Sequence, residues 1–135
     1  MKYDEFINQV KQRAGLESRE VSERVIAAVL ATLSEHMAGR EPHNLAAQLP
    51  DGIAQYLGHD PSENADARGE RFSVQEFFER VGKRENVETS EAEQHSRVVI
   101  EVLGEAVTEG EFRSVRAQFP AEYDQLFDGR SIATQ

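Results

Sequence analysis

Histidines are the first residues to test for chemistry, because a neutral imidazole binds metal ions and transfers protons near pH 7. The chain has four of them, His36, His43, His59 and His95. No two stand four residues apart, which is the spacing that places two metal ligands on one face of a helix. Asp60 follows His59, and such a pair binds a metal ion only adventitiously. We predict no metal site and interpret the four as surface histidines.

The segment from Asp60 to Arg71 places oxygen-bearing side chains at the first, third and fifth positions of an EF-hand calcium loop. The sixth position of such a loop needs glycine for a sharp turn, and here it is Ala65. The twelfth needs a bidentate glutamate, and here it is Arg71. We therefore expect no calcium binding.

Nucleophilic catalysis needs a serine, threonine or cysteine beside a base that a third group orients. The chain has no cysteine. Its candidate serines stand where helices are predicted to start, and there their hydroxyls cap free N–H groups. They are Ser18, Ser22, Ser73 and Ser90. No Gly-x-Ser-x-Gly motif and no phosphate-binding glycine loop occurs. We predict that the chain is not an enzyme and has no catalytic residue and no cofactor.

A repeated turn is a candidate for recognition. Gln48-Leu49-Pro50 recurs later in the chain as Gln118-Phe119-Pro120. One hypothesis is that the two turns form a paired binding feature across an axis of symmetry. The alternative is structural, with each glutamine bonding backbone carbonyls that the proline leaves free and the residue between them in the core. We favour the structural alternative and keep Gln48, Pro50, Gln118 and Pro120 as candidate interaction residues.

Three glutamates, Glu101, Glu105 and Glu109, are spaced by four residues and so share one face of a predicted helix. Such an acidic strip can dock a basic partner, although most rows of this kind simply face solvent. We interpret the row as a solvated face. Glu101 and Glu105 are kept as candidate interaction residues.

The charge of the chain limits its partners. It has 25 acidic and 15 basic residues and a formal net charge of −10, which disfavours nucleic acid and anionic membranes as main partners. The N-terminus carries no secretory pattern. The longest apolar run, Val25 to Ala31, is too short to span a bilayer. We expect a cytoplasmic protein that binds neither nucleic acid nor membrane.

Apolar residues recur at helical spacing through most of the chain. The first helix is predicted to start at Tyr3 and stop at Gly15, and the second to start after a Ser18 cap. The second is apolar over so wide an arc that we expect it to be central. Ser73 and Ser90 begin capping boxes, which predict the starts of two further helices.

Pro50 removes a backbone donor and pushes Leu49 away from helical geometry. This predicts short helices near 42–48 and 50–57 with a break between them. One kinked helix over 42–57 is an alternative that the sequence leaves open.

The two parts of the chain follow one pattern. Residues 3–57 and 74–127 form an internal repeat, joined by a polar linker at about 58–72. In the openings of the two copies, identical residues recur without a gap: Glu5, Phe6, Val10 and Arg13 as Glu76, Phe77, Val81 and Arg84. A lone unit of this size buries only about 60% of its unfolded surface, so we expect the copies to pack together. We predict one domain over 1–135, an all-α helical bundle of two tandem halves with pseudo-two-fold symmetry.

Five stretches carry a family resemblance: Tyr3–Val10, Ala46–Pro50, Arg71–Phe77, Ala117–Pro120 and Tyr123–Phe127. In this combination and order the chain resembles a family of uncharacterised bacterial proteins, domain-of-unknown-function family 2267. The resemblance covers nearly the whole chain. It implies an all-helical, duplicated fold in a bacterial cytoplasm. It implies no activity, cofactor or catalytic residue.

Two classes of function remain open. The first is a protein–protein interaction or assembly module, which acts with an unidentified partner protein or as a homo-oligomer. The second is a binder of a small apolar or amphipathic ligand between the two halves. The first predicts an exposed apolar patch on the folded chain. The second predicts a closed apolar cavity with a few polar groups near the axis of symmetry.

Overall fold

The computed structural model describes residues 1–37, 41–57 and 70–127, and every regular element in these ranges is a helix. The elements are α1 (Tyr3–Ala14), α2 (Arg19–His36), α3 (Glu41–Gln48), the 3₁₀ helix η1 (Ala54–Leu57), α4 (Val74–Glu85), α5 (Thr89–Ala106), α6 (Glu109–Arg116), the 3₁₀ helix η2 (Ala121–Tyr123) and α7 (Asp124–Phe127). The all-α prediction is confirmed for these residues. Most of the expected linker at 58–72, and with it His59 and most of the tested calcium segment, lies outside them.

The first hairpin, α1 and α2, starts and turns where the sequence predicts. Phe6, Ile7 and Val10 share one face of α1 and are buried. Gly15 ends α1 with a φ of 66°, a left-handed conformation that suits glycine. The Ser18 hydroxyl then accepts a backbone N–H of the first turn of α2 at 3.1 Å.

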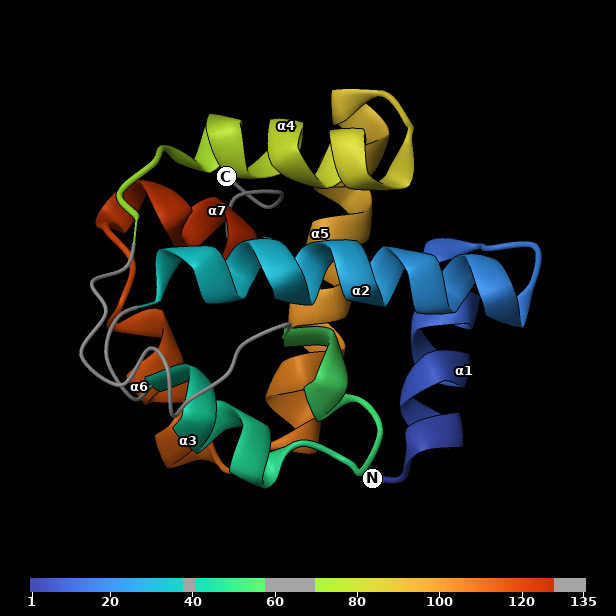
Figure 1. Cartoon of the computed structure of the whole chain (residues 1–135), viewed down its shortest axis with the longest axis horizontal. Helices are drawn as coiled ribbons and strands as arrows, with labels where there is room; N and C mark the ends of the chain where they lie inside the picture. The colour runs from blue at the N-terminus through green and yellow to red at the C-terminus, as the bar shows by residue number, and fades with distance from the viewer. Residues whose placement is uncertain (38–40, 58–69, 128–135) are drawn as a thin grey trace.

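Helix α2 crosses the middle of the molecule, where it contacts α1, η1, α4 and α5 (Figure 1). Its buried apolar side chains are Val25, Ile26, Ala28, Val29, Leu30 and Leu33. They cover more than one face, as expected of a helix with neighbours on several sides. The prediction of a central second helix is confirmed.

The segment after Pro50 differs in part from its prediction. Helix α3 ends at Gln48, so the alternative of one kinked helix is wrong. The second short helix is a single 3₁₀ turn that begins at Ala54, not near residue 50. A turn occupies the intervening residues, because Gly52 has a φ of 92° and a Cβ there would lie 2.9 Å from the ring of Tyr3. That backbone conformation is incompatible with a helix.

The second hairpin, α4 and α5, begins with the predicted Ser73 cap, whose hydroxyl accepts the N–H of Glu76 at 3.0 Å. The predicted cap at Ser90 is wrong, since Glu88 is the N-cap of α5 and makes no side-chain capping bond. The reason is the tight connection. Asn86 turns the chain at a φ of 61°, and the chain enters the helix before it reaches Ser90.

The last elements close the molecule against both hairpins. Thr108 caps α6, with its hydroxyl 3.1 Å from the N–H of Glu111. Near the end of the described chain, the buried Tyr123 donates its hydroxyl hydrogen to the carbonyl of Phe72 at 2.7 Å. Contacts between the two parts of the chain join α1 to α5, α2 to α4 and α5, and α3 to α6. The apolar core is therefore shared by both parts.

Candidate functional site

The first candidate turn joins two short helices. Gln48 accepts the backbone N–H of Thr108 at its Oε1, at 2.9 Å, and so ties the end of α3 to the start of α6. This differs from the expected bond to a carbonyl freed by the proline. The carbonyl that Pro50 cannot bond is that of Ala46, and it already accepts the N–H of Leu49 at 3.3 Å. Both Leu49 and Pro50 are buried.

The second candidate turn lies against a different element. Gln118 is partly buried, and its backbone N–H donates to the carbonyl of Val115. The ring of Phe119 stacks on His36 at the end of α2, with the centroids 4.3 Å apart. Pro120 is exposed and precedes η2. The two turns thus contact α6 and α2 respectively.

The acidic row does not extend as predicted. Helix α5 ends at Ala106, so Glu109 belongs to α6, where it pairs with Arg113 at 3.1 Å. Glu101 and Glu105 do lie together, and both bind the guanidinium of Arg13 from α1 at 2.8 Å. The hydrogen bond from Arg13 lowers the pKa of the Glu105 carboxyl. Both carboxylates therefore already hold a cation of the chain itself.

The interpretation of the histidines as surface residues is wrong for two of them. His43 is exposed, but His36 and His95 are buried. His36 lies among the rings of Phe72, Phe119 and Tyr123, at centroid distances of 5.1, 4.3 and 5.0 Å. Burial lowers its pKa, because an imidazolium ion would lose its hydration there. Its Nδ1 is buried and makes no hydrogen bond.

His95 instead has a carboxylate partner. Its Nδ1 lies 2.7 Å from Oε1 of Glu85, the last residue of α4. The two residues are 5% and 4% exposed. The hydrogen bond to Glu85 raises the pKa of His95, and Glu91, whose Oε2 is 3.9 Å from Nε2, acts in the same direction. The second carboxylate oxygen of Glu85 is buried without a hydrogen-bond partner.

The Glu85–His95 pair is the arrangement that sequence reasoning missed. A signal for it was present, since His95 stands three residues after Ala92 and four before Val99, on the apolar stripe of the helix. The nearby Ser96 donates its hydroxyl hydrogen to the carbonyl of Ala92 at 2.7 Å and so faces its own helix. The Glu85–His95 pair thus holds a proton inside the second hairpin.

A second pair of acid groups joins α3 and α6. Burial, together with the neighbouring carboxyl group of Glu41, raises the pKa of Glu111 to about 7. Glu41 Oε1 and Glu111 Oε2 are buried and have no hydrogen-bond donor. Two carboxyl groups that share such a site disfavour each other's ionisation, so Glu111 more readily keeps its proton. In the part of the chain that the structure describes, no three histidine, aspartate or glutamate side chains converge to hold a metal ion.

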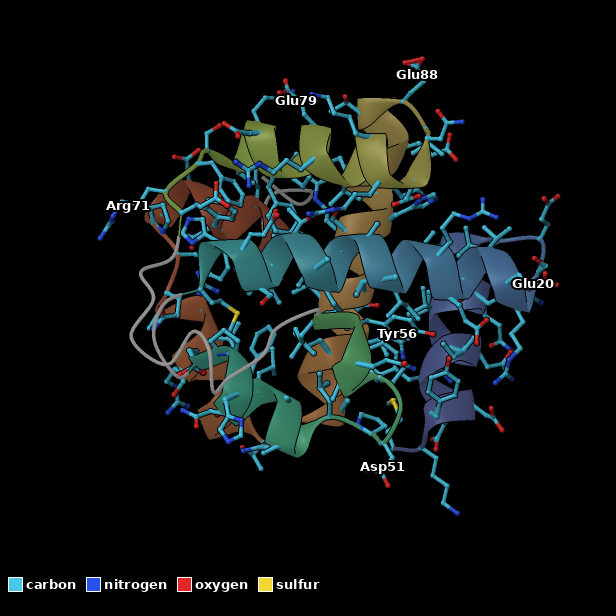
Figure 2. All side chains as sticks on the ribbon, viewed as in Figure 1. Glu20, Asp51, Tyr56, Arg71, Glu79 and Glu88 are labelled. Atoms are coloured by element: carbon cyan, nitrogen blue, oxygen red, sulfur yellow. The ribbon has the colours of Figure 1, made fainter. Side chains whose placement is uncertain are left out.

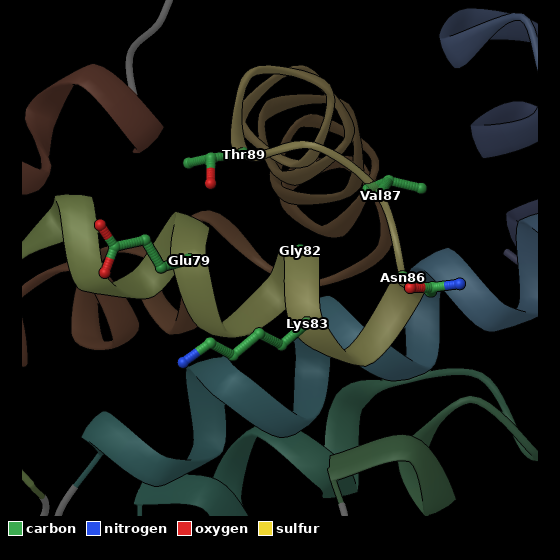
Figure 3. Close-up of a pocket in the computed structure, with 6 residues that line it drawn as sticks. All are labelled: Glu79, Gly82, Lys83, Asn86, Val87 and Thr89. Atoms are coloured by element: carbon green, nitrogen blue, oxygen red, sulfur yellow. The ribbon is translucent and has the colours of Figure 1, made fainter.

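Two grooves lie on the hairpins. One is about 400 Å³ in volume, lies between α4 and the start of α5, and is lined by Glu79, Gly82, Lys83, Asn86, Val87 and Thr89 (Figure 3). The other is about 290 Å³, lies on the first hairpin, and is lined by Asp4, Ile7, Asn8, Lys11 and Arg19. Both are open, and their walls are mostly polar. Neither is the closed apolar cavity that a ligand between the halves would need.

The fully exposed large apolar residues of the described chain do not by themselves form the expected apolar patch. Among residues 1–37, 41–57 and 70–127, Met1 is the one large apolar residue that is largely exposed, at 40%. Of the described helices, none combines the length and the apolar character needed to cross a membrane.

Comparison with known proteins gives a family but no function. No curated protein matches the chain. The model of an uncharacterised conserved protein family, DUF2267, matches residues 3–126. This match spans both hairpins and the short helices that follow each of them. The chain therefore belongs to the DUF2267 family of uncharacterised conserved proteins.

Proposed function

We propose that this chain is a non-catalytic protein-interaction module of the bacterial cytoplasm, and that a partner with a basic surface binds the outer face of the second hairpin. The charge distribution supports the choice of half. Residues 74–127 contain twelve acidic and six basic side chains, whereas residues 3–57 contain eight and five. A negative field of this kind attracts basic partners and speeds their association.

The proposal rests on the exposure and the lack of ion pairing of two glutamates, Glu79 and Glu88. Both are exposed, and neither pairs with a lysine or arginine among the described residues. Figure 2 shows them pointing away from the body of the molecule, on α4 and at the start of α5. The acids of the second half that do hold an arginine are Glu76, Glu93, Glu101, Glu105, Glu109 and Asp124. Glu79 and Glu88 are thus available to cations of a partner.

The groove of Figure 3 supports the same surface. It lies beside Glu79 and offers the amide of Asn86, the hydroxyl of Thr89 and the ammonium of Lys83. These groups donate and accept hydrogen bonds, as the rim of a protein interface does. The small apolar ligand is a less suitable occupant, because the walls of this open groove are polar.

We also propose that residues 1–135 form one domain whose halves, 3–57 and 74–127, are tandem copies related by a pseudo-two-fold axis. The paired helices have equal lengths: 12 residues in α1 and α4, 18 in α2 and α5, and 8 in α3 and α6. Repeated units joined by a linker commonly pack with such symmetry.

Reciprocal contacts between the halves support this axis. Arg13 of α1 binds Glu105 of α5 at 2.8 Å, and Arg84 of α4 binds Glu35 of α2 at 2.7 Å. Arg13 and Arg84 are corresponding residues of the repeat. Glu41 and Glu111 also correspond in the aligned repeats, and Glu41 lies near enough to raise the pKa of Glu111. A contact between two corresponding residues is expected where the axis passes.

The experiment compares capture of partners by three forms of the untagged chain, immobilised and exposed to a lysate of the native host. The parent is set against E79Q/E88Q, which removes two charges from the proposed surface. The matched control is E17Q/E20Q, which removes two charges from exposed acids at the opening of α2. We expect a captured protein, identified by mass spectrometry, that E79Q/E88Q loses at least tenfold and E17Q/E20Q retains.

Salt supplies an independent check, because interactions between exposed charges weaken at high ionic strength. The captured protein should be released between about 0.15 and 1 M NaCl. Equal loss with both double variants, or capture unchanged by either, would refute binding at the second hairpin. Native mass spectrometry of the parent tests the homo-oligomer, which would appear as multiples of the chain mass.

A further inference from the structure

The second hairpin contains a buried charge pair where the first contains aliphatic residues. Glu85 is the last residue of α4, and the last residue of α1 is Ala14. His95 lies at the same distance from the start of α5 as Val25 does from the start of α2. The first hairpin therefore adopts the same fold without these two charged groups. Their presence in the second hairpin is not a requirement of the architecture.

The proton on His95 decides whether the buried carboxylate of Glu85 has a charged partner. With the imidazole protonated, Nδ1 donates to the Glu85 carboxylate at 2.7 Å and the two charges compensate each other. Without that proton, Glu85 becomes a buried carboxylate beside a neutral ring, and its Oε2 already lacks a donor. A buried charge without a partner is strongly destabilising.

The charged groups that face His95 are Glu85 from α4 and Glu91 from α5, and within the described ranges no other charge affects its pKa. The arginines nearest in the chain are bound elsewhere. Arg84 pairs with Glu35 of α2. Arg97 pairs with Glu93 and donates to the carbonyl of Gln125. Neither arginine therefore replaces the proton of His95.

We propose that the Glu85–His95 pair is a proton-controlled latch, which holds α4 against α5 while His95 is protonated and lets the second hairpin open when the proton is lost. Gly82 explains why opening has a large effect. A Cβ at Gly82 would lie 3.0 Å from the carbonyl of Val87 and 3.6 Å from Ala92, so the two helices touch closely beside the pair. Hydration of Glu85 requires that this contact loosens.

The direction of the pH effect follows from proton linkage. The closed hairpin holds its proton more tightly than the open one, in which His95 has its ordinary pKa near 6.5. Between 6.5 and the raised pKa of the closed form, opening releases one proton. The latch is therefore intact below pH 6.5, and the opening equilibrium rises about tenfold for each pH unit above it until the folded pKa is passed.

The test is hydrogen–deuterium exchange of α4 and α5 across pH 6 to 9, with rates corrected for the intrinsic effect of pH, together with an NMR titration of His95. We expect His95 to titrate above 6.5, and protection of the second hairpin to fall over the same range while protection of α1 does not. A titration at or below 6.5, or loss of protection spread equally over both hairpins, overturns the proposal.

The first hairpin supplies the control variant. E85A/H95V gives the second hairpin the residues of the first, and it should keep its protection from pH 6 to 9. E85A alone removes the carboxylate and leaves a buried histidine, so its protection should fall as pH decreases, the opposite sign. Persistence of the parent's pH dependence in E85A/H95V refutes the latch.

If E85A does not fold, the double variant alone decides, because its pair of aliphatic residues already occurs in a folded hairpin of this chain. The titrations of His36 and Glu111 lie outside the second hairpin and are common to all variants.

Discussion

The two helical hairpins have the same design but are held together by different forces at their bends. Both end their first helix in a left-handed residue, Gly15 at a φ of 66° and Asn86 at 61°. In the first hairpin the adjacent positions are aliphatic and Ser18 caps the second helix. In the second they are the Glu85–His95 pair, and the helix start has no side-chain cap. The comparison shows that the hairpin fold can carry a buried charge pair at these positions but does not need one. The closing of the second hairpin therefore depends on the protonation of His95, whereas the first hairpin has no such dependence.

The largest expected effect tests whether the hairpins belong equally to one core. Phe6 and Phe77 are corresponding residues of the repeat, and each is 0% exposed. Each substitution to alanine should lower the free energy of unfolding by about 3–5 kcal/mol, because it removes a large buried ring and leaves a cavity. Urea unfolding followed by circular dichroism measures both.

Phe6→Ala and Phe77→Ala should also give one cooperative transition each, since α1 packs on α5 and α2 on α4. A clearly smaller cost in one of them, or a second transition, would mean that the hairpins unfold separately and that the shared core contributes little.

The next prediction tests whether the glutamate–histidine pair of the second hairpin can be transferred to the first. Val25→His places a histidine without a partner at a position that is 2% exposed, and should cost about 2–3 kcal/mol. Adding Ala14→Glu should return part of this loss, with a coupling energy of about 0.5–3 kcal/mol, if the carboxylate reaches the ring as Glu85 does. Unfolding in urea at pH 6 measures both variants against the parent.

The double variant A14E/V25H should then lose stability as pH rises above 6.5, by the same linkage as the second hairpin. The single variant V25H should lose it as pH falls, because its buried imidazole resists protonation. Additive effects of the two substitutions at pH 6 would show that the aligned positions of the two hairpins are not equivalent in space.

Local signals were sufficient to predict the helices but not the pair. Apolar spacing, the stop at Gly15 and the Ser18 and Ser73 caps depend on residues within one turn, so sequence alone places them. The Ser90 cap failed because Asn86 sets the chain into the helix earlier than a local capping pattern indicates. Spacing along a single helix also misplaced Glu109, which lies beyond the end of α5.

The candidate site depends on contacts that no local pattern encodes. Glu85 and His95 are ten residues apart on two helices, and only the angle of the hairpin brings them to 2.7 Å. Arg13 meets Glu105 from the other half of the chain. The repeat predicted that the halves pack together, but not which charged residues meet between them, because many arginines and glutamates occupy comparable exposed positions.

A smaller effect concerns the helix starts. Ser18→Ala and Ser73→Ala each remove a hydroxyl that accepts a backbone N–H at 3.1 and 3.0 Å, and each should cost about 1 kcal/mol. Glu88→Ser should instead stabilise the chain by about 0.5 kcal/mol, since it adds the missing acceptor but removes a charge that favours the helix dipole. Thermal unfolding of the three variants at one pH measures the contrast. A loss of stability in Glu88→Ser would show that Glu88 already satisfies the start of α5 through its charge.

The smallest effect distinguishes the two reciprocal ion pairs. Arg13 binds Glu101 and Glu105, which are about half exposed. Arg84 binds Glu35 and also donates to the buried hydroxyl of Thr32 at 2.6 Å. Each substitution to alanine should cost less than about 1 kcal/mol at low salt, since partly exposed ion pairs gain little from pairing.

High salt should change the stability cost of the two substitutions to different extents. In about 1 M NaCl, where exposed charges are strongly screened, most of the cost of Arg13→Ala should be lost, because its carboxylate partners are about half exposed. The cost of Arg84→Ala should persist in part, because the bond to Thr32 is to a buried neutral group that salt does not screen. Equal salt dependence of the two variants would mean that Thr32 gains nothing from Arg84, and that the contacts across the proposed axis are equivalent in energy as well as in position.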